Sequence, residues 1–404
     1  MQQKILLLGG SPQQLVAIQA AKELGYYTIV CDYLPDNPGQ YIADRFYKVS
    51  TTDIEAVYQV AVSEGVAGIL AYASDPAALP AAVVAERLGL PTNPSHSVEI
   101  LGVKHSWRKF LQDNGFPCPK TCSFLASETK ETILQKAADL AFPVVVKPTD
   151  SSGSKGISII NTWDDLDPAV ALAEKFSRNK VLLIEEYIER GYPSVIGGDI
   201  FVWDGKVVLF GEMECLRDNL KSPLIPIGEK WPPLLTQLQR DRIHHELQRV
   251  VSRLGVRFGE MNIEILLDKE DNVHFLELGP RAGGNMIPIQ LSDAFGVDLI
   301  RANVQAAMRV KPEFVGSRIV PNEGCFMHYV LHSYENGQLE SIQIDKKIEG
   351  YVYRKVMYKK NGDYVEAFDN AAKALGIIFL NFPSVEDMEY FCRNHDSLIN
   401  AVLV

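Results

Sequence analysis

The stretch that decides the fold runs from Phe258 to Asn285 and reads FGEMNIEILLDKEDNVHFLELGPRAGGN. Its pattern predicts two strands, Met261 to Leu267 and Val273 to Leu278, joined by a polar turn. With the turn centred in the middle of the polar residues, Glu264 lies opposite Glu277. Because successive side chains alternate between the two faces of a strand, both carboxylates then share one face, with Cβ atoms about 5 Å apart.

Two carboxylates at that separation need a cation between them, because they repel by about 3 kcal/mol at an effective dielectric constant of about 20. Mg²⁺ is a natural candidate, since it typically takes one or two carboxylates together with phosphate oxygens. Arg281 follows the second strand, and the Gly283-Gly284 pair after it allows backbone to approach a ligand closely. The alternative interpretation is a hairpin whose polar face is simply solvated.

Composition is that of an ordinary globular protein. The chain has 404 residues, 47% of them hydrophobic and 23% charged, which is enough for two or three domains. A net charge of −11 argues against a nucleic-acid surface. The six cysteines are scattered and lack zinc-finger spacing, so they predict free thiols. No signal segment and no membrane-spanning apolar run is present, which predicts a cytoplasmic protein.

The first hundred residues alternate strand and helix. Strands are expected at Ile5 to Leu8, Tyr27 to Cys31 and Gly68 to Ala71, with helices between and after them, and this spacing predicts a parallel, doubly wound sheet. Gly9-Gly10 faintly suggests a dinucleotide site, but the G-x-G-x-x-G pattern is absent. Further on, helices are expected from Ser97 to Gly115 (with Lys104, Arg108 and Lys109 on this helix), from Gln237 to Leu254 and from Asp293 to Met308.

A second feature of the chain is a strand that ends in Lys147 and is followed by the small-residue loop TDSSGSKG, residues 149–156. A loop of this kind between two strands can cradle phosphates through its backbone N–H groups, although it is not a Walker A motif. Strands are also expected over Val181 to Ile188, Ile196 to Val202 and Lys206 to Glu212. The segment Cys215 to Pro233 is expected to be a long loop, either a wall of the substrate site or a plain connection.

The order of these pieces resembles the ATP-grasp superfamily. The matching features are Lys104 before a helix, VVVKP with its Gly/Ser loop, the hinge IEEYI, IEILLD, and ELGPRAGG. The resemblance implies a parallel N-terminal domain (1–100), a two-lobed ATP-grasp module (101–310, with a lid lobe at about 118–187) and a small C-terminal α+β domain (311–404). It also implies ATP and Mg²⁺ as cofactors, with Mn²⁺ as a substitute, and activation of a carboxylate as an acyl phosphate.

The resemblance assigns roles to individual positions. Lys104 and Lys147 would hold ATP phosphates under a mobile lid made of Ser151, Ser152, Gly153, Ser154 and Gly156. Glu185 would meet the adenine amino group, and backbone at Glu186 and Ile188 would read the edge of the ring. Glu264 and Glu277 would be the Mg²⁺ ligands. Arg281, with Lys147 the predicted catalytic pair, would face the transferred phosphate, and Arg217 is a candidate partner for a substrate carboxylate.

One departure from the family pattern narrows the prediction. Biotin carboxylase and carbamoyl-phosphate synthetase carry an Asn in E-x-N-P-R where this chain has Gly279, which makes it look more like the L-amino acid (dipeptide) ligases. The leading prediction is therefore an ATP-dependent carboxylate–amine ligase acting on two small molecules. A bicarbonate-activating enzyme of the carboxylase or carbamoyl-phosphate type and a non-catalytic nucleotide-binding protein are the alternatives. A homodimer is compatible with the sequence, and the substrates are not readable from it.

Overall fold

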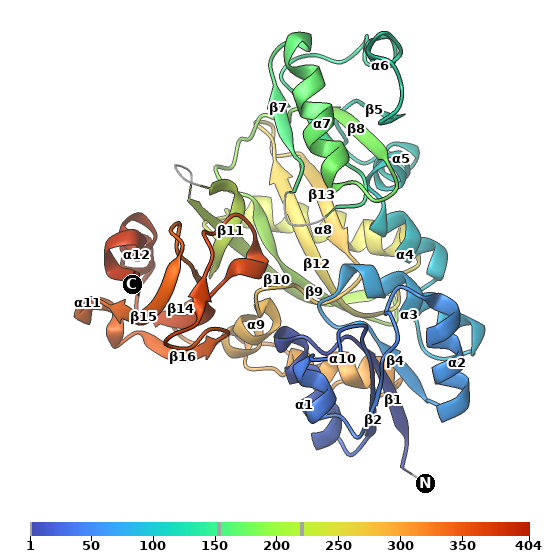
Figure 1. The fold of residues 1–404 in the computed structure, drawn as a ribbon, viewed down its shortest axis with the longest axis vertical. Helices are drawn as coiled ribbons and strands as arrows, with labels where there is room; N and C mark the ends of the chain where they lie inside the picture. The colour runs from blue at the N-terminus through green and yellow to red at the C-terminus, as the bar shows by residue number, and fades with distance from the viewer. Residues whose placement is uncertain (1, 152–154, 219–221) are drawn as a thin grey trace. The chain divides into compact units, whose positions relative to one another are not determined.

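The computed structural model describes residues 2–151, 155–218 and 222–404. Contacts divide the chain into two compact units (Figure 1). Unit 1 comprises Met1–Val98, Ile196–Ile263 and Gly279–Val404, and unit 2 comprises Glu99–Val195 and Glu264–Leu278. The described elements form a mixed α/β architecture with several sheets, as the sequence predicts at that level.

Unit 1 begins with a parallel sheet in the order β3-β2-β1-β4. Its strands are β1 (Lys4–Leu8), β2 (Tyr27–Cys31), β3 (Arg45–Tyr47) and β4 (Gly68–Leu70), and its helices are α1 (Leu15–Glu23), α2 (Ile54–Glu64) and α3 (Asp75–Arg87). Leu6 and Leu8 pack in a core with α2 and α3, whereas Ile5 and Leu7 face α1 and α10 (Leu299–Ala307). The predicted parallel sheet with helices on both faces is therefore present (Figure 1).

An eight-stranded sheet has the order β13-β12-β9-β10-β11-β14-β18-β16. Its strands are β9 (Ile196–Trp203), β10 (Lys206–Asp218), β11 (Ser222–Trp231), β12 (Phe258–Leu267), β13 (Val273–Gly279), β14 (Cys325–Leu331), β16 (Val352–Met357) and β18 (Gly376–Phe382). Helices α8 (Gln237–Leu254) and α9 (Ile287–Phe295) accompany it. Alternate residues of β12, from Met261 to Leu267, are buried, whereas Asn262 and Glu264 are only half-buried, which is the period-2 pattern of a strand.

Unit 2 contains a four-stranded sheet in the order β5-β8-β6-β7, with antiparallel pairing throughout. The strands are β5 (Thr121–Leu125), β6 (Val144–Pro148), β7 (Ser158–Ile160) and β8 (Val181–Glu186). Helices α5 (Lys104–Asp113), α6 (Lys130–Lys136) and α7 (Leu166–Phe176) belong to the same unit, and α4 (Ser95–Gly102) spans the boundary between the units.

The C-terminal part of unit 1 adds the three-stranded sheet β17-β15-β19. Its elements are β15 (Gly337–Ile344), β17 (Tyr364–Val365), β19 (Ile399–Leu403), α11 (Lys346–Glu349) and α12 (Val385–Leu398). Short 3-10 turns lie at Pro12–Gln14, Pro38–Tyr41, Trp163–Asp165 and Ala371–Lys373. A core that includes Met327, Leu380 and Phe391 ties α12 to β14 and β18.

Three expectations about local structure are wrong. The helix expected from Ser97 to Gly115 is two helices, because Val103 adopts an extended backbone conformation (φ −131°, ψ 112°) between α4 and α5. The helix expected from Asp293 to Met308 is also two, because Gly296 ends α9 with a left-handed conformation (φ 64°). The segment Cys215 to Pro233 is mostly strand: β10 continues to Asp218, and β11 returns antiparallel to it.

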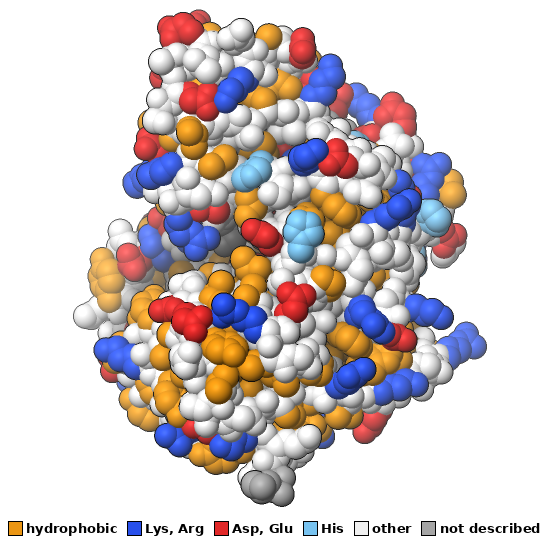
Figure 2. Space-filling model, turned by 90° about the vertical axis from the view of Figure 1, so that its right-hand side faces the viewer, with side chains coloured by type: hydrophobic (Ala, Val, Ile, Leu, Met, Phe, Trp, Pro, Cys, Tyr) orange, Lys and Arg blue, Asp and Glu red, His pale blue; other side chains and the backbone are white. Residues whose placement is uncertain are grey.

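Surface charge is mixed rather than concentrated. On the face drawn in Figure 2, Lys and Arg side chains are interspersed with Asp and Glu, and no extended field of one sign is seen on that face. None of the helices in the described part of the chain has the length and apolar character needed to span a bilayer.

Candidate active site

Unit 2 gathers ionisable side chains from three separate elements into one buried cluster. Lys147 lies near the end of β6, Glu185 near the end of β8, and Arg108 on α5; their exposed fractions are 6%, 4% and 1%. The Arg108 Nε donates to Glu185 Oε2 at 2.7 Å, and the Lys147 ammonium donates to Glu185 Oε1. Arg108 Nη1 donates to the carbonyl oxygens of Phe275 and Leu276 at 3.0 and 3.1 Å, which connects the cluster to β13.

Electrostatics in this cluster are dominated by burial and by mutual charge. Burial lowers the pKa of Lys147 to about 8; Arg108 and Lys104 add to that effect, and Glu185 opposes it. Burial also disfavours ionised Glu185, but the charges of Arg108 and Lys147 outweigh it and lower the pKa of that carboxyl to about 2. Glu185 is therefore ionised at neutral pH, and Lys147 is mostly protonated but easily titrated.

Lys104 connects this cluster to a predicted metal ligand and to the predicted phosphate loop. Its ammonium lies 3.2 Å from Glu277 Oε2 and donates to the Ser151 carbonyl at 2.7 Å. Its backbone N–H donates to the Thr149 carbonyl at 2.9 Å. Glu264 is a half-buried residue on β12, the neighbour of β13 in the sheet. Unit 2 therefore holds Lys104, Lys147, Glu264 and Glu277 together.

Part of the predicted lid lies outside the described residues, namely Ser152, Gly153 and Ser154. Two residues at the described ends of the loop, Ser151 and Gly156, have a defined local structure. Ser151 receives the Lys104 hydrogen bond through its carbonyl. Gly156 has a positive φ of 76°, and a Cβ there would lie 3.2 Å from Pro148 and Phe176 atoms, so glycine is favoured at this position. The lid role itself stays a prediction.

The predicted adenine contacts fit the geometry unequally. Both oxygens of Glu185 are already bound by Arg108 and Lys147, so a contact with an adenine amino group would compete with buried cations. The Glu186 N–H donates to the Lys120 carbonyl at 3.0 Å, so this amide is already satisfied. The Ile188 N–H has no hydrogen-bond partner within the described part of the chain. Of the three, the Ile188 amide is best suited to read a base edge.

Arg281 belongs to unit 1 and is held by a bidentate ion pair with Asp75 at the start of α3. Its Nε and Nη2 donate to the two Asp75 oxygens at 2.7 and 2.8 Å, and its Nη1 donates to the Ala282 carbonyl at 3.1 Å. Gly279, which stands where the E-x-N-P-R pattern has Asn, lies close to this guanidinium. A Cβ at Gly279 would lie 3.3 Å from the Arg281 guanidinium carbon, so a side chain there would require only a small shift of the guanidinium.

Arg217, the predicted partner of a substrate carboxylate, is a half-buried residue of β10 at an irregular step in the β10–β11 pairing. Its Nε is buried and has no hydrogen-bond partner among the described residues. An unpaired buried N–H of this kind is costly and is commonly relieved by a ligand or a water. The substrate role of Arg217 stays a prediction.

Two residues of these clusters were missed by the sequence interpretation. Arg108 was noted only as a helix residue, and Asp75 was not singled out. Their partners lie 77 and 206 positions away in the sequence, so no local pattern connects them. The only sequence signal for Arg108 is its i, i+4 spacing from Lys104 in KHSWR, which places both cations on one helix face.

The order of elements, with the Lys147 strand, the Glu185 strand end and the paired carboxylate strands, defines an ATP-grasp protein. The chain belongs to the family of the carbamoyl-phosphate synthase L chain ATP-binding domain, whose model matches residues 104–312. The resemblance predicted from the sequence is thereby confirmed, and the predicted class of ATP-dependent ligases agrees with it.

Individual relatives share only about a quarter of the aligned residues with this chain. The carbamoyl phosphate synthase large chain of Thermotoga sp. (strain RQ2) is 25% identical over 319 residues, which are 74% of this chain and 28% of that one. The large chain of Xylella fastidiosa (strain 9a5c) is 25% identical over 345 residues, covering 79% and 31%. The chain thus spans about three tenths of the length of these relatives.

Solved structures share the fold along the whole chain. An L-amino acid ligase from Bacillus licheniformis superposes with a TM-score of 0.83 at 21% identity, and both chains are fully covered. A phosphoribosylglycinamide synthetase from Anaerococcus prevotii gives 0.79 at 18% identity, again with full coverage of both chains. At these identities the likeness establishes the fold, and the reaction and substrates are a separate question.

Proposed function

We propose that this chain is an ATP-dependent ligase that activates a small carboxylate as an acyl phosphate and transfers the acyl group to an amine. The observation that carries the proposal is the buried cluster of unit 2, in which Arg108 and Lys147 share one carboxylate, Glu185. A surplus of buried positive charge is costly unless an anion neutralises it, and the phosphates of ATP are such an anion.

In this proposal Lys104 and Lys147 bind ATP phosphates, and residues 151–156 cover them. Binding of an anion would favour the charged form of Lys147, whose pKa is lowered to about 8 without one. The Ile188 amide and the Glu186 carbonyl would then hydrogen-bond the base. Glu185 acts here as the countercharge that keeps Arg108 and Lys147 in place rather than as an adenine ligand.

Glu264 and Glu277 fit a Mg²⁺ ion by the chemistry of their donors, because a hard divalent cation prefers carboxylate oxygens and shares them with phosphates. Glu277 is also adjacent to the Lys104 ammonium at 3.2 Å, so one carboxylate would face both the metal and the phosphate-binding lysine. When bound, the ion would supply charge neutralisation at the phosphoryl group.

The chemical sequence conserves atoms and charge at each step. A carboxylate oxygen attacks the terminal phosphorus of ATP, and the bond to ADP breaks with the electron pair leaving on ADP. The amine nitrogen then attacks the carbonyl carbon, forms the C–N bond, expels phosphate and loses one proton. Arg281 would stabilise phosphoryl charge, because the ion pair with Asp75 fixes its guanidinium and a fixed donor group stabilises developing charge best.

The test is ADP release measured with a panel of amino acids and other small carboxylates, with and without an added amine. The proposal predicts ADP formation that requires a carboxylate, and hydroxamate formation when hydroxylamine replaces the amine. ADP release with bicarbonate as the only carboxylate would instead support the carboxylase or carbamoyl-phosphate alternative. Nucleotide binding without ADP release under any condition would support the non-catalytic alternative.

A further inference from the structure

The turn that carries Arg281, residues 280–286 between β13 and α9, is held through its backbone by two neighbouring strands of the eight-stranded sheet. The backbone N–H of Asn262 on β12 donates to the Arg281 carbonyl at 2.9 Å. The Gly283 N–H donates to Oδ2 of Asp199 on β9 at 2.8 Å. The backbone of the turn is therefore fixed to the sheet at two points, in addition to the ion pair that fixes the guanidinium.

Asp199 and Asn262 also hold each other in place. Asp199 is completely buried, and its Oδ1 accepts a hydrogen bond from the Asn262 side-chain amide at 2.9 Å. The same amide donates to the Gly198 carbonyl at 2.9 Å. Each carboxyl oxygen of Asp199 therefore has an N–H donor, one from a side chain and one from the turn. Buried polar groups whose partners are all supplied in this way make their surroundings rigid.

The turn packs directly on this pair at Gly283. A Cβ on Gly283 would lie 2.7 Å from Asp199 Oδ1, which is closer than non-bonded atoms approach, and 3.0 Å from Asn262 Nδ2. A Cβ on Gly284 would lie 3.9 Å from Gln13 Oε1, which is an ordinary contact. The sequence suggests that the two glycines allow backbone to approach a ligand. At Gly283 the structure shows a close approach to Asp199.

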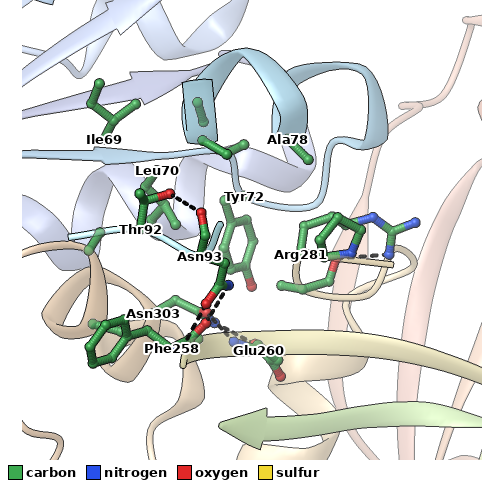
Figure 3. A pocket seen from close by; sticks show the side chains of 18 of the residues that line it. Ile69, Leu70, Tyr72, Ala78, Thr92, Asn93, Phe258, Glu260, Arg281 and Asn303 are labelled. Carbon is green, nitrogen blue, oxygen red and sulfur yellow. Dashed lines mark hydrogen bonds between the residues drawn. The ribbon is translucent and has the colours of Figure 1, made fainter. Parts of the chain in front are cut away.

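A second carboxyl extends this network. Glu260 forms a side-chain hydrogen bond with Asp199, and burial, together with the charge of Asp199, raises the pKa of Glu260 well above its usual range. Glu260 Oε2 also accepts a hydrogen bond from the Asn303 side-chain amide, and these two residues lie side by side in the pocket that Arg281 lines (Figure 3). The Asp199 carboxyl is thus connected to α10 as well as to β12.

We propose that Asp199 is a positioning residue of the ligase: its carboxyl fixes the backbone of residues 281–283 and so holds the Arg281 guanidinium where phosphoryl charge develops. The proposal rests on the ligase function and on the part that Arg281 plays in it. A donor group stabilises developing charge best when it is fixed before the reaction. Asp75 fixes the guanidinium, and Asp199 fixes the chain that carries it. Asp199 is completely buried, so it acts through Arg281 rather than on the substrate.

Asp199→Asn tests the proposal, because an amide has one acceptor oxygen where the carboxyl has two. Its NH₂ group would face either the Gly283 N–H or the Asn262 amide, and two donors cannot bond each other. In the ligase assay kcat is expected to fall by about tenfold or more, with the KM for ATP changed by less than about threefold. Asp204→Asn is the matched control, because Asp204 is exposed in the turn after the same strand, and it should leave kcat unchanged. A rise in KM with an unchanged kcat in Asp199→Asn would overturn the proposal.

A double-mutant cycle shows whether Asp199 acts through Arg281. In a protein that already carries Arg281→Lys, Asp199→Asn is expected to lower kcat by less than about threefold, because the group that it positions is absent. An undiminished loss of about tenfold in that background would overturn the proposal, because it would show that Asp199 acts independently of Arg281.

Hydrogen exchange of residues 281–286 gives a readout that needs no turnover. In Asp199→Asn the Gly283 amide is expected to exchange about tenfold faster or more, whereas Asp204→Asn should leave its exchange unchanged. If the unchanged protein shows no turnover, the ligase function fails, and faster exchange still supports Asp199 as the residue that holds the turn. If turnover is found but Asp199→Asn changes neither kcat nor exchange, the positioning role is wrong and the ligase stands. Should Asp199→Asn fail to fold, the same measurements on Asn262→Ala, which removes one donor to Asp199, decide the question in the same way.

Discussion

Each of the two units contains a cluster of buried ionisable side chains, and the carboxyl groups in the two clusters have opposite surroundings. In unit 2, Arg108 and Lys147 share a single carboxylate, Glu185, and the surplus charge is positive. In unit 1, the carboxyls of Asp199 and Glu260 are buried and accept hydrogen bonds from amide groups. The comparison shows that a buried carboxyl stays ionised where cations bind it and favours its protonated form where its neighbours are amides and a second carboxyl.

The pKa directions express the same contrast. The pKa of Glu185 is lowered to about 2 because cations on both of its oxygens outweigh burial. The pKa of Glu260 is raised because burial and a second carboxyl act together. An anion is therefore expected to bind at the first cluster, whereas Glu260 in the second is expected to hold a proton.

The largest expected effect comes from Glu185→Gln. This change leaves Arg108 and Lys147 buried without their countercharge, and breaking a buried pair in this way typically costs about 3–5 kcal/mol. Urea denaturation should show a fall of that size in the free energy of unfolding. Glu186→Gln is the control, because Glu186 is only half-buried and should change stability by less than about 1 kcal/mol.

Glu185→Gln should also remove an acid-dependent loss of stability. A carboxyl whose pKa is lowered on folding stabilises the protein above its unfolded-state pKa, and that stabilisation is lost as the pH falls from about 4.5 to about 2. The slope of unfolding free energy against pH in this range should therefore be smaller in the variant. An identical slope in both proteins would mean that Glu185 is not held ionised by its neighbours.

Arg281→Lys comes next, because a point charge cannot replace a planar donor group. Loss of one well-placed donor at a developing charge typically costs about 10²–10³ in kcat. We expect a fall in kcat of this order with little change in ATP affinity. Asp75→Asn should give a smaller fall, since it frees the guanidinium rather than removing it. A change confined to KM would show that Arg281 binds only the ground state.

Glu277→Gln keeps the shape of a predicted metal ligand but removes its charge. ADP formation should be lost at limiting Mg²⁺ and partly recovered at high Mg²⁺, because a weaker site can still be filled by mass action. The expected shift in the Mg²⁺ dependence is tenfold or more, equivalent to about 1.4 kcal/mol. Near-normal turnover of the variant at limiting Mg²⁺ would contradict the assignment.

The smallest expected effect is the pH dependence of ATP binding. Burial lowers the pKa of Lys147 to about 8, so the lysine is charged below that pH and loses its proton above it. ATP affinity should therefore weaken by up to about tenfold per pH unit above pH 8. Lys147→Arg should flatten this dependence, because a guanidinium stays charged. A flat profile in the unchanged protein would remove Lys147 from the phosphate site.

The sequence predicted those helices and strands whose ends are determined by residues close to them, such as capping residues and glycines. Helix α8 has the bounds expected from the sequence, because Thr236 and Gln239 form a capping box and Gly255 ends the helix in a left-handed conformation. The break at Val103 was missed although Gly102, directly before it, is a residue at which helices commonly end. The β10–β11 hairpin was taken for a loop because its prolines and charged residues conceal the alternation of a strand.

Contacts between residues far apart in the sequence limited how much of the candidate site could be predicted. Lys104, Lys147, Glu264 and Glu277 were identified because each follows or lies on a recognisable strand or helix. Arg108 and Asp75 were not identified, because the residues with which they form ion pairs, Glu185 and Arg281, are far away in the sequence. The Asp199–Glu260 pair illustrates the same limit, since each carboxyl by itself resembles an ordinary strand residue until folding buries the two together.

The central claim, a ligase that works through an acyl phosphate, is tested most directly by following oxygen atoms. The carboxylate that best stimulates ADP release is labelled with ¹⁸O in both oxygens, and the phosphate formed with the amine is analysed by mass spectrometry. The account predicts one ¹⁸O atom in each phosphate released, because the carboxylate oxygen that attacks phosphorus leaves with it. Phosphate that carries no label, at a normal rate of product formation, would contradict the account.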